Sequence, residues 1–155
     1  MKEEVIQIFI DCIKNYFLQF GNEEVEFGTP YLSKPDDIKE IILEYTGAIS
    51  ISGDYRGALY ISSGRDLLEE LTELILDVKS ALENDIIDIA GEITNTIAGN
   101  ARQTLGQNFL ISVPLIITGK FISIETPKLK IPTYIIPFSW RNKKSYLCIG
   151  LETNT

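Results

Sequence analysis

The best candidates for a chemical function in this sequence are one carboxylate and one amide, Glu92 and Asn95. They are three residues apart and Gly99 follows four residues later, so a helix places all three on one stripe. The stripe presents a carboxylate, then an amide that can both donate to and accept from a water molecule, then no side chain. The alternative interpretation of so short a pattern is a solvated helix flank, or an asparagine packed against a neighbouring helix.

The absence of histidine excludes several other kinds of site. Histidine is the commonest metal ligand and general base, and without it Ser–His and Cys–His nucleophile pairs are impossible. The sequence also contains no CxxC pair, phosphate-binding P-loop or dinucleotide-binding fingerprint. The paired carboxylates of glycoside hydrolases are not identifiable, because Asp and Glu are scattered over faces that we expect to be solvated.

A long amphipathic helix over residues 84–106 is predicted to position Glu92 and Asn95. Asn84 or Asp85 can cap its start, since a short polar side chain accepts from an N–H of the first turn. Gly106 is suited to end it. Apolar residues recur at i, i+3 and i+4 spacing and form a separate stripe. This apolar stripe consists of Ile86, Ile89, Ile93, Ile97 and Ala101.

Two glycines inside this helix indicate that something approaches it closely. Gly91 and Gly99 each cost about 1 kcal/mol relative to alanine in a helix interior. Two such costs in one helix suggest the close approach of another element of the fold or of a partner.

The order of the other elements predicts an α+β fold in a single domain. Helices that are segregated from hairpin-linked strands favour a largely antiparallel sheet. Pro114 indicates an edge position or an irregularity in its strand, because proline cannot donate to a ladder. The expected elements are a helix over 2–20, an extended or edge segment over 23–32, a strand over 48–52 at the end of a β-branched run over 38–52, a strand over 58–62 that forms a hairpin with it, a helix over 65–79 capped by Ser62 or Ser63, and strands over 109–120, 121–125, 131–138 and 144–152.

Composition and charge restrict the class of partner and the compartment. The chain of 155 residues has a formal net charge of −8, which argues against nucleic acid and gives no attraction to anionic lipid. Cys12 and Cys148 are expected to be reduced residues of the core, although one disulfide is the alternative. The chain begins without a signal-peptide pattern and has no apolar run of membrane-spanning length, so we expect a cytoplasmic protein.

Residues 91–100, Gly-Glu-Ile-Thr-Asn-Thr-Ile-Ala-Gly-Asn, resemble the signature helix of the CheC/CheX/FliY phosphatases of bacterial chemotaxis. Residues 112–119 resemble the strand that follows that helix, 48–57 the hairpin before it, and 27–30 an early extended segment. CheC-type members carry two copies of the E-x-x-N motif, whereas this chain carries one, which favours the CheX branch. The resemblance implies one CheX-like domain over 1–155, with two long central helices on one face of the sheet and an N-terminal helix.

The resemblance also implies an activity, that of a protein phosphatase acting on the aspartyl phosphate of a CheY-like response regulator. Asn95 would orient the attacking water, and Glu92 would pair with the active-site lysine of the receiver domain. Gly99 would let the backbone of the partner come close. Arg102 would be a further contact, or else a solvated residue. The chain would need no cofactor of its own, because the receiver supplies Mg²⁺.

The sequence leaves open the oligomeric state and two alternative functions. The resemblance implies a homodimer joined through the sheets, as in CheX-type members. The alternation at Ile122 and Ile124 suggests a strand that could form such an edge, or that could equally lie inside the sheet. The first alternative function is a non-catalytic module that binds a receiver or dimerises in a two-component pathway. The second is a small-molecule-binding domain, which has no support beyond Trp140 and the tyrosines.

Overall fold

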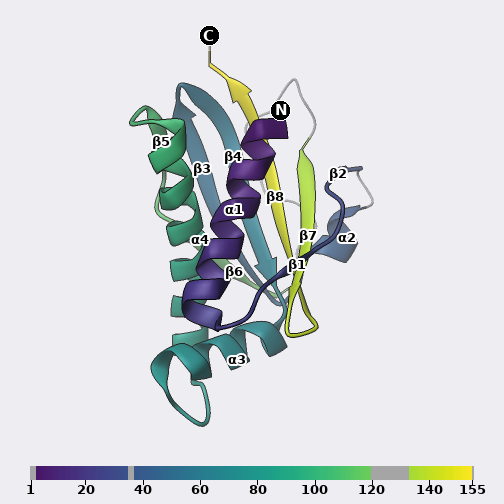
Figure 1. Cartoon of the computed structure of the whole chain (residues 1–155), viewed down its shortest axis with the longest axis vertical. Helices are drawn as coiled ribbons and strands as arrows, with labels where there is room; N and C mark the ends of the chain where they lie inside the picture. The colour runs from purple at the N-terminus through teal and green to yellow at the C-terminus, as the bar shows by residue number, and fades with distance from the viewer. Residues whose placement is uncertain (1–2, 35–36, 120–132, 155) are drawn as a thin grey trace.

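The computed structural model describes residues 3–34, 37–119 and 133–154, and arranges them as one sheet with helices packed against it (Figure 1). The elements in chain order are α1 (Glu3–Gly21), β1 (Glu26–Phe27), β2 (Tyr31–Leu32), α2 (Ile38–Ile41), β3 (Tyr45–Gly53), β4 (Tyr55–Ser63), α3 (Arg65–Leu76), α4 (Glu83–Leu105), β5 (Phe109–Ile111), β6 (Leu115–Thr118), β7 (Tyr134–Trp140) and β8 (Lys143–Thr153).

The described strands form one eight-stranded sheet, in the order β1-β7-β8-β4-β3-β5. Strand β2 also pairs with β7, and β6 also pairs with β3. Every pairing among the described residues is antiparallel. The predicted hairpin is the β3–β4 pair, which runs in register from Tyr45 opposite Ser63 to Ile51 opposite Gly57. The predicted α+β class with an antiparallel sheet is therefore confirmed.

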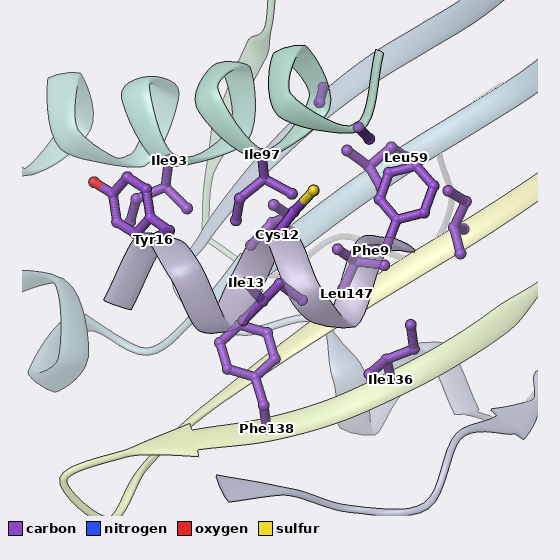
Figure 2. Packing of buried hydrophobic residues seen from close by; sticks show 14 of the residues in the cluster. Phe9, Cys12, Ile13, Tyr16, Leu59, Ile93, Ile97, Ile136, Phe138 and Leu147 are labelled. Atoms are coloured by element: carbon purple, nitrogen blue, oxygen red, sulfur yellow. The ribbon is translucent and has the colours of Figure 1, made fainter. Parts of the chain in front are cut away.

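Helices α1, α3 and α4 cover one face of the sheet, with α1 beside α4 and α3 across one end (Figure 1). The predicted apolar stripe of α4 is buried throughout and faces this core. Figure 2 shows how side chains of α1, such as Phe9 and Ile13, fill the space between α4 and the strands. Trp140 is the largest fully buried side chain among the described residues, and its ring centroid lies 5.8 Å from that of Phe17.

The opposite face of the sheet carries a smaller apolar cluster. Ile41 and Ile42 pack there against Ile135 and Cys148. The β-branched run over 38–52 is not extended throughout, because its first residues form α2 ahead of β3. β-Branched residues favour strands only weakly, and burial of these isoleucines against the sheet overrides that preference.

Glycine at position 47 lets α4 lie directly on β3. A Cβ atom at Gly47 would overlap the Thr94 hydroxyl and lie 2.9 Å from Thr94 Cβ. Thr94 is 1% exposed, and its hydroxyl donates to the Ala90 carbonyl oxygen at 2.8 Å, so it is held in place. The position of α4 above the sheet therefore depends on the missing side chain at Gly47.

The predicted helix caps are wrong at both central helices. Helix α3 follows Gly64 without a side-chain cap, and the Ser63 hydroxyl instead bonds a serine hydroxyl of β8 at 2.8 Å. Helix α4 follows Leu82, also without a side-chain cap, so Asn84 and Asp85 lie inside its first turn. Its predicted end is confirmed, because Gly106 follows the last helical residue with φ at 110°.

Pro114 interrupts the apolar run that was expected to be one strand over 109–120. Strands β5 and β6 both pair with β3, and residues 112–114 separate them. The expected irregularity at proline is therefore confirmed. The predicted strand over 121–125, including Ile122 and Ile124, lies outside the described residues, and the homodimer stays a prediction.

Candidate functional site

Helix α4 carries Glu92 and Asn95 on the side away from the sheet. Asn95 is exposed and Glu92 is half-buried, while the residues between them, Ile93 and Thr94, are 2% and 1% exposed. The two buried residues fix the rotation of the helix about its axis. The Asn95 amide can therefore reach a partner without any rearrangement of the fold.

The Glu92 carboxyl lies in a less polar environment than a typical surface carboxylate. Burial raises its pKa above the ordinary value, and the hydroxyl of Tyr16 acts in the opposite direction. Tyr16 comes from α1, and Figure 2 shows its ring beside Ile93, the residue that follows Glu92. A charge that has lost part of its hydration interacts more strongly with an opposite charge, so this carboxylate is suited to a cationic partner.

The two glycines of α4 have different surroundings. A Cβ atom at Gly91 would meet Ile116 of β6 at 3.6 Å, an ordinary contact distance. A Cβ atom at Gly99 would have no atom of the described residues within 4 Å. The close approach inferred at Gly91 is therefore an internal one that alanine would also allow, whereas internal packing gives no reason for glycine at position 99.

An open hollow of about 660 Å³ lies at the C-terminal end of α4. Gly99 and Arg102 line it, together with residues that include Gln103 and Gln107. Arg102 is exposed, and its Nη2 donates to the Gln107 carbonyl oxygen at 3.1 Å. The hollow thus continues the exposed side of α4 beyond Asn95, although neither Glu92 nor Asn95 lines it.

Within the three described ranges, no group of three or more His, Cys, Asp or Glu residues could hold a metal ion. None of the helices found there is both long and apolar enough to cross a membrane. Cys12 and Cys148 are buried free thiols that belong to different apolar clusters, as the sequence predicted.

Sequence reasoning did not identify Tyr16 as part of the site. It lies in the helix predicted for residues 2–20, on the buried face of that helix, and nothing local connects it with a helix that begins at Glu83. The one indication in the sequence was that Tyr16 places a polar hydroxyl on an otherwise apolar face of its helix. Trp140 is fully buried, which agrees with a core residue rather than a ligand-binding one.

In a comparison with protein families, residues 45–139 match the family described as chemotaxis phosphatase CheX. The matched segment begins at the first residue of β3 and includes the whole of α4. No curated protein matches the chain.

Several solved structures share the whole fold. A CheC-like superfamily protein from Shewanella sp. PV-4 is 27% identical, with a TM-score of 0.83 over 98% of this chain and 99% of the other. The chemotaxis protein CheX from Vibrio vulnificus is 26% identical, with a TM-score of 0.80 over 96% and 99%. A chain in the CheX–CheY–BeF3–Mg²⁺ complex from Borrelia burgdorferi is 21% identical, with a TM-score of 0.78 over 96% and 97%.

Proposed function

Because the chain belongs to the chemotaxis phosphatase CheX family, we propose that it hydrolyses the aspartyl phosphate of a CheY-like response regulator. The observation that supports this most is the exposed Asn95 beside the half-buried Glu92 on the outward side of α4. The Borrelia burgdorferi structure contains CheX together with CheY, BeF3 and Mg²⁺, which supports the choice of a receiver domain as substrate.

In this proposal Asn95 enters the active site of the receiver and orients one water molecule. The amide oxygen accepts a hydrogen bond from the water and so directs a lone pair of the water toward phosphorus. A bond forms between the water oxygen and phosphorus, and the bond from phosphorus to the aspartyl oxygen breaks. The products are inorganic phosphate, which carries the two protons of the water, and a free carboxylate. Mg²⁺, which the receiver supplies, neutralises charge on the phosphoryl oxygens. Positioning of this kind contributes much of the rate in phosphoryl transfer.

Glu92 has a docking role in the proposal, as the partner of the active-site lysine of the receiver. Its partial burial means that part of the cost of removing water from the carboxylate has been met before the receiver binds. Gly99 and Arg102 extend the contact toward the hollow at the end of α4. The net charge of −8 offers no long-range attraction to an acidic receiver, so docking rests on these local contacts.

The proposal is tested by following the loss of labelled phosphate from purified CheY-type receivers in Mg²⁺, with and without this chain. We expect loss from at least one receiver to be more than tenfold faster than its spontaneous rate. Binding is measured separately with the same receivers loaded with beryllofluoride. Binding without any acceleration would contradict the phosphatase and favour the alternative, a non-catalytic receiver-binding module.

Substitution of Gly99 by alanine is expected to have opposite effects on stability and on activity. The added Cβ would have no described atom within 4 Å, so the free energy of unfolding should rise by about 1 kcal/mol. If the receiver backbone approaches here, release at low receiver concentration should fall about tenfold. Thermal unfolding and the release assay measure the two effects.

Gly91→Ala is the matched control for this prediction, because it is the same change in the same helix. Its Cβ would make only an ordinary contact with Ile116. We expect it to stabilise the helix without a loss of release. Equal activity of the two alanine variants would remove Gly99 from the docking surface.

A further inference from the structure

The hydroxyl of Tyr16 is a buried polar group with no role in the phosphatase steps proposed above. Tyr16 is 1% exposed, and its hydroxyl completes no hydrogen bond of ordinary geometry with the described residues. Buried hydroxyls almost always have a partner, because leaving one unpaired forfeits its hydration without replacement. The ring is fixed by its neighbours, and its centroid lies 5.4 Å from that of Phe17 and 4.8 Å from that of Phe20. The hydroxyl therefore cannot readily turn to solvent.

The acceptor within its reach is the carboxylate of Glu92. Helices α1 and α4 pack side by side, and the two groups face each other across that interface. Burial, and then the charge of Glu92, raises the pKa of Tyr16 above its ordinary range. The Tyr16 hydroxyl in turn lowers the pKa of Glu92 against the larger effect of burial. Among the described titratable groups on the elements packed around α4, Tyr16 is the one that acts on this carboxyl.

We propose that Tyr16 is a positioning residue, which donates a hydrogen bond to the Glu92 carboxylate and holds it in the orientation that pairs with a cationic group of the partner. A small rotation of the Glu92 side chain completes this bond, since its carboxylate lies at the half-exposed margin of the α1–α4 interface. One oxygen of the Glu92 carboxylate then accepts from the Tyr16 hydroxyl, and the other oxygen faces the partner. The part of this inference that concerns the receiver lysine rests on the proposed function.

Tyr16→Phe removes the hydroxyl and keeps the ring, so it tests the hydrogen bond without emptying the core. In the isolated protein, the Glu92 carboxyl carbon is followed by ¹³C NMR during a pH titration. A hydrogen bond donated to a carboxylate favours its charged form, so its loss should move the Glu92 midpoint to higher pH. In the release assay, KM for the phosphorylated receiver should rise about fivefold while kcat changes by less than twofold. A residue with only a structural role would not raise KM while leaving kcat nearly unchanged.

Tyr60→Phe is the matched control. Tyr60 is partly buried, and burial raises its pKa to about 12, but it packs with the apolar cluster on the opposite face of the sheet. We expect neither the Glu92 midpoint nor KM to change in this variant. In the Glu92→Gln background, Tyr16→Phe should add no further rise in KM.

An unchanged Glu92 midpoint in Tyr16→Phe would overturn the proposal, as would equal rises in KM for Tyr16→Phe and Tyr60→Phe. The titration needs no receiver and no catalytic activity. If the chain proved not to release phosphate at all, the proposed function would fail while a shifted midpoint would still support the bond between Tyr16 and Glu92.

Discussion

Replacement of Asn95 by alanine is expected to lower phosphate release from a phosphorylated CheY-type receiver by about 100-fold or more, the scale at which loss of positioning affects a reaction. The physical reason is that Asn95 would be the group that holds the attacking water in line with phosphorus. Because the side chain is exposed, the free energy of unfolding should change by less than about 0.5 kcal/mol. The binding of a beryllofluoride-loaded receiver should remain within about threefold of the original value, since Glu92 and the rest of α4 are intact.

Two further variants make this prediction sharper. Asn95→Gln keeps the amide but moves it by one methylene group, and we expect an intermediate loss of release. Asn84→Ala removes another exposed asparagine of the same helix, about 16 Å along the axis from Asn95 at 1.5 Å per residue, and should leave release unchanged. If Asn95→Ala releases phosphate as fast as the unmodified chain, Asn95 does not have the proposed role.

The helix that holds the site, α4, could be predicted from the sequence because its apolar residues keep helical spacing along its whole length. Its apolar stripe determines which side lies on the sheet, and the position of Asn95 on the exposed side follows from that spacing. The end of the helix at Gly106 is also a local effect, since glycine readily adopts a positive φ. These properties need no knowledge of which elements become neighbours.

The features that the sequence did not reveal all depend on packing between distant elements. Tyr16 lies near Glu92 only because α1 packs beside α4, although many residues separate the two positions in the chain. Gly91 and Gly99 have the same intrinsic cost in a helix, and only their surroundings distinguish an internal contact from an open position. The serine capping rule failed at α3 because Ser63 is paired within the sheet.

The substitution of Gly47 by alanine is expected to give the largest loss of stability among these changes, about 3 kcal/mol in the free energy of unfolding measured by urea denaturation. The new Cβ would overlap the Thr94 hydroxyl and lie 2.9 Å from Thr94 Cβ. Thr94 cannot easily move, because it is buried and its hydroxyl is bonded to the Ala90 carbonyl of its own helix. Either α4 lifts from β3 or Thr94 takes a strained rotamer.

A double variant separates this contact from a general effect of the substitution. Thr94→Ala removes the overlapping hydroxyl, so Gly47→Ala should cost at least 1 kcal/mol less in that background, within the usual range for residues in contact. Thr94 directly precedes Asn95, so a lifted α4 would also move the proposed catalytic amide. We therefore expect folded Gly47→Ala protein to release phosphate about tenfold more slowly, in line with the sensitivity of positioned groups to small displacements. Additive costs in the double variant would mean that the space at Gly47 does not set the position of α4.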